Sequence, residues 1–502
     1  MGIDAKHPLY EKWHDKWVRC NHCFEGEDAI KAEGFKYLPP LPSMILDGVE
    51  NPQDLGFKRW ELYMLRANFP DDFSSAVTNN LGLLHQKPPT IQLPKEMEYM
   101  REVCSADGED IVALLRRINE LQLRNGRLGL LLDLPQGESP DNKPYISVYN
   151  ALAPINWDDG KDELGNVNLN MVVLDESGPV RVNQFDWKEQ KRYRVLELGP
   201  LETDERSGTA VYKQNLYIDD TNYDAGQMIA PYYKGKTLDV IPFQFINTTD
   251  ITPDPEAPPL LGLANICLSM YRSDADYRQN LYMQGQDTLV VIGGTGVDDK
   301  APQRVGAGAR IDVGIGGDAK YVGVSGDGLS EQRLALAADK VEAQIKAGQM
   351  VNNTKSTQES GEAMKTRIAA RTASLIRIAY TGAAGLENLL KICAKWMGLN
   401  PDEVVVKPNL EFTKSMFNGQ DFIQIITARN LGAPLSLESI HGWLVDQGMT
   451  TRTFEEEMAV VEAELKKWPL PSDPKADLNT EQQGEKAKKD KQEPKEEEKK
   501  EE

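Results

Sequence analysis

The sequence predicts an α+β protein with several domains, and three features of the chain support this class. Its 502 residues exceed what one hydrophobic core ordinarily supports, so several domains are expected. From about 145 to 246, short apolar runs alternate with Gly, Asp and Asn clusters, which is typical of strands and turns. Three later stretches, 259–286, 329–350 and the residues after Gly361, have the periodicity of long helices.

The N-terminal part combines helices with one buried strand. Apolar residues recur at mostly helical spacing over 60–84, where a Lys-Pro-Pro turn stops the pattern. A second helix is predicted over 107–124. The apolar run 128–134 lies between Gly126 and Pro135, and its length favours a buried strand.

The β-rich stretch contains at least four strand-like runs. They are rich in β-branched and aromatic residues and are separated by turn-forming clusters, so the stretch is predicted to form one β-rich region or two. The four runs are 171–174, 193–196, 211–212 and 240–245.

A long helix is predicted over 259–286, after Pro258 and Pro259. At 1.5 Å per residue it would be about 40 Å long. Its apolar residues alternate at spacings of three and four, as in a helix that packs against other helices, although the pattern taken alone favours an ordinary core helix. One polar residue in the stripe, Asp274, would need a partner. The stripe residues are Leu260, Leu263, Cys267, Met270, Asp274, Tyr277 and Leu281.

Two further long helices flank a polar loop. The helix over 329–350 has Leu334, Ala338, Val341 and Ile345 on one face, and helical periodicity resumes after Gly361. The apolar pattern fails completely between them, at residues whose polar side chains predict a flexible loop. The loop residues are Asn352, Asn353, Thr354, Lys355, Ser356, Thr357 and Gln358.

The last part of the chain is predicted to be helical and then disordered. A helix is expected over 420–429, and Ser436 is placed to cap another. Thr453 and Glu456 form a capping box that opens a final helix. Residues 469–502 are mostly Lys, Glu, Gln, Asp and Pro with almost nothing apolar, a composition that predicts disorder.

No catalytic, metal or cofactor site is predicted from the residues. Cys20 and Cys23 form a C-x-x-C pair, but no second pair is present to complete a structural zinc site, so both are interpreted as packing residues in a helix. The glycine-rich segments 293–296 and 306–317 match neither a P-loop nor a dinucleotide-binding turn and are interpreted as turns between strands. The five histidines are scattered singly, so no nucleophilic triad is indicated.

Charge and cysteine content bound the possible surroundings and partners. The chain has 57 basic and 78 acidic residues, a formal net charge of −21, whereas wrapping of nucleic acid needs a basic surplus. Five cysteines form an odd, sparse set that suits a reducing compartment. No apolar run approaches the roughly 20 residues that span a bilayer, and no secretory signal is recognisable, so the chain is expected in the cytoplasm and away from membranes.

Four short motifs make the sequence resemble the portal proteins of tailed bacteriophages. They read Ile-Pro-Phe-Gln-Phe-Ile over 241–246, Pro-Pro-Leu-Leu-Gly-Leu-Ala-Asn over 258–265, Tyr-Arg-Ser-Asp-Ala-Asp-Tyr-Arg over 271–278 and Val-Val-Ile-Gly-Gly over 290–294. The resemblance spans roughly residues 5–450. One departure is the segment Thr-Gln-Glu-Ser-Gly-Glu-Ala at 357–363, where relatives often have a Glu-Thr-Ala core, and it leaves the loop length open.

The resemblance implies a multidomain portal fold with wing, stem, clip and crown, which assembles into a ring that is usually twelve-fold. On this sequence it implies an N-terminal wing region at 1–185, a β-rich region including the clip at 186–258, a stem helix at 259–287, wing strands with tunnel helices and a tunnel loop (about 351–360) at 288–409, a helical crown at 410–468 and a charged tail at 469–502.

The function implied by the resemblance is that of a conduit for DNA during packaging and ejection. Such a ring sits at one vertex of the capsid in the virion, after assembly in the host cytoplasm. Its implied partners are further copies of the chain, double-stranded DNA in the channel, the terminase large subunit, the major capsid protein and scaffold, and later a head–tail adaptor. No enzyme activity is implied.

The loop lysine, Lys355, has two open interpretations. It either touches DNA phosphates in the channel or is a solvated loop lysine. The first predicts that Lys355→Glu impairs DNA packaging while rings stay intact, and a normal phage yield from this variant would favour the second.

Two alternatives stay open for the whole chain. It could be another phage head–tail connector or adaptor ring protein, although such adaptors are generally much shorter. An enzyme acting on nucleotides or DNA would need a phosphate loop or a set of metal-binding carboxylates, neither of which is recognisable in the sequence.

Overall fold

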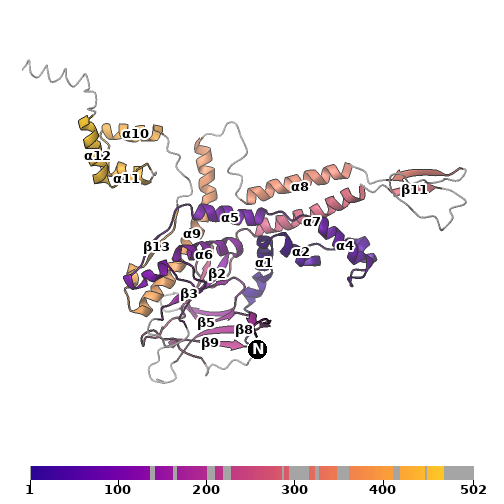
Figure 1. Ribbon diagram of the computed structural model, residues 1–502, viewed down its shortest axis with the longest axis horizontal. Helices are drawn as coiled ribbons and strands as arrows, with labels where there is room; N and C mark the ends of the chain where they lie inside the picture. Colours follow the sequence, from indigo (N-terminus) through magenta and orange to yellow (C-terminus); the bar gives the residue numbers. More distant parts are fainter. Residues whose placement is uncertain are drawn as a thin grey trace, which may run out of the picture. The chain divides into compact units, whose positions relative to one another are not determined.

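The computed structural model describes residues 2–135, 142–161, 167–200, 210–218, 228–284, 288–292, 316–322, 327–347, 361–410, 419–446, 449–450 and 452–467. It divides the chain into two compact units, Met1–Phe412 and Thr413–Glu502. Both helices and antiparallel sheets are present, so the predicted α+β class is confirmed (Figure 1). The predicted loop at 352–358 and the charged tail at 469–502 lie outside the described residues.

Apolar periodicity in the sequence predicts most of the long helices of the first unit. The helix bounds are α1 Pro8–Glu25, α2 Glu27–Ala32, α3 Pro42–Leu46, α4 Leu55–Arg66, α5 Asp72–Leu84, α6 Ile111–Asn125, α7 Leu261–Gln284, α8 Asp327–Lys346 and α9 Gly361–Met397, with short 3-10 turns at Gly34–Lys36, Lys95–Arg101 and Pro401–Glu403.

The described strands form five antiparallel sheets. A four-stranded sheet has the order β4-β5-β8-β9, and a three-stranded sheet has the order β10-β2-β3. The other three are the pairs β1–β13, β6–β7 and β11–β12. The bounds are β1 Thr90–Gln92, β2 Arg127–Asp133, β3 Tyr145–Asn150, β4 Pro154–Lys161, β5 Val167–Asp175, β6 Gly178–Arg181, β7 Trp187–Gln190, β8 Arg192–Pro200, β9 Ala210–Ile218, β10 Phe243–Asn247, β11 Thr288–Ile292, β12 Asp318–Val322 and β13 Val405–Lys407.

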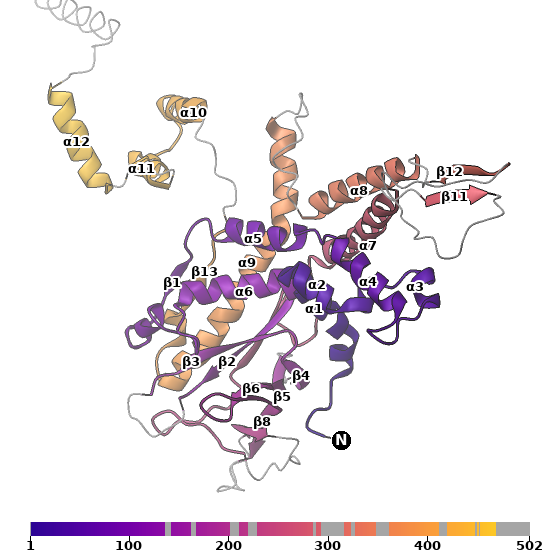
Figure 2. The ribbon, with the colours of Figure 1, turned by 45° about the vertical axis from the view of Figure 1, so that its right-hand side comes forward.

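Strand β2 lies at the centre of the first hydrophobic core. Every residue of β2 is buried, as the continuous apolar run predicted. Helix α6 packs against it on one side, and α9 contacts both β2 and β10 (Figure 2). Gly385 of α9 allows this approach, because a Cβ there would lie closer than 3.0 Å to the buried Ile246 side chain of β10.

A second hydrophobic core is built from helices. It joins α1, α4 and α5 to α7, the end of α8 and the middle of α9. Helix α1 links the two cores, since Trp17 packs into the first and Cys20 and Cys23 pack into the second. Both cysteines are fully buried in this helix, as the packing interpretation expected.

One predicted helix, 60–84, is wrong as a single element. The structure has α4 and α5 in its place, with a break at 67–71. Pro70 has no N–H to donate within a helix. The N–H groups of Asn68 and Phe69 donate instead to Asp274 on α7, at 2.8 Å, and to Glu27 on α2, at 3.0 Å. Tertiary contacts therefore supply the partners that a continuous helix would have supplied.

The region 186–258 is β-rich but is not a unit of its own. Strand β8 pairs with β5, and β10 pairs with β2, both of which lie before residue 186. The β6–β7 pair spans the predicted boundary at 185/186. The strands expected to join the wing from 288–328 are β11 and β12, which pair with each other between α7 and α8.

The predicted caps are confirmed where the structure describes them. In the second unit, whose helices are α10 Gly419–Asn430, α11 Leu437–Asp446 and α12 Phe454–Lys467, Ser436 Oγ accepts from the Ser439 N–H at 3.0 Å. The Thr453 N–H donates to Glu456 at 3.0 Å, and the Glu456 N–H donates to Thr453 at 3.4 Å, completing the capping box.

The buried thiols predict an alkaline limit on stability. Burial raises the pKa of Cys104, Cys267 and Cys393 to about 12. Thiols of an unfolded chain ionise near pH 8.5. Above about pH 9 the unfolded chain therefore binds fewer protons than the folded one, and the free energy of unfolding falls as pH rises. We expect a loss of about 1 kcal/mol per buried thiol between pH 9 and 10, measured by urea unfolding.

The control for this prediction is Cys393→Ala. The variant lacks one buried thiol, so its free energy of unfolding should fall less steeply between pH 9 and 10. An identical pH slope in the variant and the parent chain would contradict the assignment to this thiol.

Candidate functional site on the α7 and α8 helices

The predicted stripe of α7 divides into a buried half and a more exposed half. The first four apolar side chains are buried among the chain's own helices, so they are not free to face a neighbouring copy. Farther along, Tyr277 is half-buried and Leu281 is 43% exposed. The buried four are Leu260, Leu263, Cys267 and Met270.

The polar residue of the stripe, Asp274, has two partners within the chain. Its Oδ2 accepts from the Arg278 Nε at 2.7 Å and from the backbone N–H of Asn68 at 2.8 Å. The carboxylate thereby holds the break between α4 and α5 against α7. The expectation that Asp274 needs a partner is met by these two groups.

Two more polar contacts tie α4 to the second half of α7. The Tyr63 hydroxyl donates to Asp276 at 2.6 Å, and burial together with this carboxylate raises the pKa of Tyr63. The Arg66 Nη2 donates to Gln279 at 2.6 Å, and its guanidinium lies 4.2 Å from the ring centroid of Tyr282. Helix α7 is therefore held along its length by the N-terminal helices.

Removing the Asp274 carboxylate is expected to weaken this attachment. Asp274→Ala leaves the Asn68 N–H and Arg278 without their acceptor and should lower the free energy of unfolding by about 1–2 kcal/mol, measured by urea unfolding. Asp274→Asn keeps an acceptor oxygen without the charge, so it should lose less. Equal losses in both variants would show that an uncharged acceptor oxygen does not replace the carboxylate, whereas no loss in either variant would contradict the attachment.

Helix α8 packs antiparallel to α7. Asn280, near the end of α7, donates to Gln332 near the start of α8 at 3.2 Å, while the Lys346 side chain at the end of α8 lies beside Gly262 at the start of α7. The small, fully buried residues Ala343 and Ala347 line the packed face of α8. Figures 1 and 2 both show the two helices side by side.

The predicted apolar face of α8 lies on its opposite side. Leu334, Val341 and Ile345 are 59%, 46% and 50% exposed, and Ala338 is exposed as well. At roughly 100° per residue these four side chains point away from the face that carries Ala343 and Ala347. We refer to Leu334, Ala338, Val341 and Ile345 as the outer stripe. Helix α8 is therefore apolar on two faces, of which the described chain covers one.

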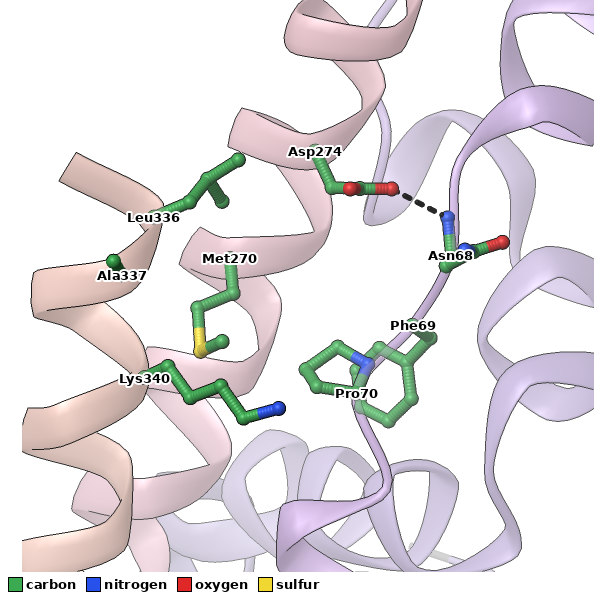
Figure 3. Close-up of a pocket in the computed structure, with 8 residues that line it drawn as sticks. All are labelled: Asn68, Phe69, Pro70, Met270, Asp274, Leu336, Ala337 and Lys340. Atoms are coloured by element: carbon green, nitrogen blue, oxygen red, sulfur yellow. Dashed lines mark hydrogen bonds between the residues drawn. The ribbon is translucent and has the colours of Figure 1, made fainter. Parts of the chain in front are cut away.

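A cavity of about 280 Å³ lies where α7, α8 and the segment after α4 meet. Figure 3 shows Met270 and Leu336 on its helical walls, with Lys340 extending from α8 toward Pro70. Asp274 lies at its rim, engaged with Asn68. The lining residues are Asn68, Phe69, Pro70, Met270, Asp274, Leu336, Ala337 and Lys340.

Sequence reasoning missed this cavity, because its walls come from three segments that are far apart in the chain. Only Met270 and Asp274 belong to a predicted stripe. The sequence feature that could have indicated the cavity is a second apolar face of α8, formed by Leu336, Ala343 and Ala347. The predicted loop that contains Lys355 lies outside the described residues.

The cysteines are placed for packing. Burial raises the pKa of Cys20 to about 12, and Cys23 and Cys267 lie in the same helical core. Within the described ranges, no three or more His, Cys, Asp or Glu side chains are grouped so that they could hold a metal ion. None of the helices in the described ranges is long and apolar enough to cross a membrane.

A family model matches the helical segment 259–397, and solved structures are similar to most of the chain. The family described as "Domain of unknown function (DUF4055)" matches residues 259–397, which run from the start of α7 to the end of α9. No curated protein matches the chain.

Two solved structures with similar chains are necks of GTA particles. The neck of a native GTA particle, computed with C12 symmetry, is 14% identical with a TM-score of 0.39, covering 74% of this chain and 89% of that chain. The neck of an empty GTA particle, computed with C6 symmetry, is 14% identical with a TM-score of 0.35, covering 84% of this chain and 98% of that chain.

Proposed function

We propose that this chain is the subunit of a phage portal ring, which conducts DNA during packaging and ejection and has no catalytic site. The observation that carries the proposal is the outer stripe of α8. A helix that packs one face within its chain and exposes a second apolar face needs a further partner to cover it. Copies of the same chain placed side by side in a ring would supply that partner. The sequence resemblance over roughly 5–450 adds the portal role.

The acidic composition fits a protein through which DNA slides better than one that binds DNA tightly. With a net charge of −21, repulsion between an anionic channel wall and DNA phosphates would allow sliding, whereas a basic wall would hold the strand by counterion release. In this proposal the segment 352–358 lines the channel, and Lys355 is its one positive charge.

We place the docking end for the terminase motor, and later for the tail adaptor, at β11 and β12. The strands of 186–258 are engaged in sheets with earlier strands, as β8 is with β5. The β11–β12 pair instead connects the ends of α7 and α8 and pairs with neither of the larger sheets. An element between two long packed helices is better suited to reach a partner than a strand inside a core sheet.

Imaging of the purified chain tests the ring. Negative-stain images together with mass photometry should show particles with a central channel and a mass of about twelve times 56.1 kDa. A compact, closed oligomer without a channel would rule out the portal role. Release of phosphate from ATP by the same sample would favour a nucleotide-acting enzyme, since a portal ring depends on a separate motor.

A further inference from the structure

The cavity beside α8 and the outer stripe of α8 lie on different sides of this helix. Leu336, Ala337 and Lys340 line the cavity, and they lie roughly 120° around the helix from the centre of the outer stripe. A ring of identical subunits needs two different, mutually complementary surfaces on each chain. Helix α8 carries the exposed outer stripe on one side and borders the cavity on another. A contact between neighbouring subunits of a ring requires two such different surfaces.

The chemistry of the cavity fits an aliphatic side chain better than a small ligand. Its walls include the apolar side chains of Phe69, Pro70 and Met270. At about 280 Å³ it lies at the lower end of the roughly 300–1,000 Å³ range of ligand sites. The carboxylate at its rim, Asp274, is already engaged by Asn68 and Arg278, so it is not free to orient a cationic ligand.

Apart from Asp274, which Asn68 and Arg278 already engage, the cavity and the outer stripe carry charged side chains of opposite sign. Lys340 lies at the cavity, as Figure 3 shows, whereas Glu342 flanks the outer stripe of the same helix. Glu342 contacts Lys346 at 3.0 Å in an exposed pair, and such pairs exchange partners at little cost. A neighbour's Glu342 can therefore turn toward Lys340 when the two surfaces meet.

We infer that the cavity formed by α7, α8 and residues 68–70 is the socket for the outer stripe of α8 from the adjacent copy of this chain. Val341 and Ile345 enter the socket, and Glu342 meets Lys340 at its rim. The inference rests on the proposed ring and adds to it the two surfaces through which neighbouring subunits contact each other.

Disulfide trapping tests the contact in the full-length protein. Asn68→Cys places a thiol at the socket and Val341→Cys places one on the outer stripe, both at exposed positions. The five native thiols are buried, so they should react slowly with a mild oxidant. Oxidised rings of the double variant are expected to give a ladder of covalently linked chains on a non-reducing gel, and each single variant should give no ladder.

The matched control combines Asn68→Cys with Ala335→Cys, an exposed position of α8 outside both the stripe and the socket. Rings are imaged before the oxidant is added, so a failure of the ring is seen separately from a failure of the contact. Rings that link as strongly through residue 335 as through residue 341, or not at all through residue 341, would overturn the inference and leave the ring in place.

A charge exchange gives a second readout that does not depend on thiol chemistry. Lys340→Glu should reduce the ring fraction roughly tenfold, because it places two carboxylates against each other, and adding Glu342→Lys to the same chain should restore it. A double variant that assembles no better than Lys340→Glu alone would contradict the pairing of these two residues.

Discussion

Val341→Glu is expected to convert the assembled protein into single folded chains. In one chain the side chain at 341 is 46% exposed, so a carboxylate there stays hydrated and the fold is unaffected. Between copies the same carboxylate would be buried without a partner, which costs several kcal/mol at every contact. Since about 1.4 kcal/mol corresponds to a tenfold change in affinity, each contact should weaken at least roughly 100-fold. Mass photometry measures the assembly, and circular dichroism measures the fold.

Ala335→Glu is the control for this prediction. It adds the same charge to an exposed position of α8 that lies outside the outer stripe, so rings of normal mass are expected. Rings of unchanged mass in the Val341→Glu variant would show that the outer stripe does not meet another copy, and the observation that carries the proposed function would be lost.

Gly56→Ala is expected to have the largest effect on the stability of the chain itself. Gly56 is buried at the start of α4, and a Cβ there would lie closer than 3.0 Å to the carbonyl oxygens of Met44 and Gly48. Both are backbone atoms, so the clash cannot be relieved by a side-chain rotation. Helix α3 would have to separate from α4, at a cost of about 3 kcal/mol or more.

The loss should appear first in α3 and α4, as faster hydrogen exchange over residues 42–66, and then in urea unfolding of the whole chain. Because α4 carries Tyr63, whose hydroxyl bonds to Asp276, displacement of α4 should also loosen α7. Loss of this support would lower the ring fraction as well.

Gly82→Ala is the matched control. Gly82 lies inside α5, is exposed and has open space where a Cβ would be added. Alanine should therefore stabilise that helix by roughly 0.5–1 kcal/mol, because glycine loses more backbone freedom on folding. Equal effects of the two substitutions would show that the close approach at Gly56 carries no cost.

Element types follow from the sequence wherever a local rule decides them. The Thr453–Glu456 capping box, the cap at Ser436 and the buried strand β2 depend on neighbours along the chain and on continuous apolar character, so the sequence alone is enough to recognise them. The break after α4 is different, because Asn68 and Phe69 find their hydrogen-bond partners on α7 and α2, far away in sequence. Local periodicity therefore predicts a continuous helix where the folded chain has two.

The apolar stripes of α7 and α8 mark the limit of this kind of prediction. Periodicity identifies both, yet the chain itself buries the first half of the α7 stripe and leaves the outer stripe of α8 exposed. Burial within a chain and burial between copies select the same residue types. Only the tertiary structure decides which of the two faces is covered, and only it brings residues 68–70, α7 and α8 together into one cavity.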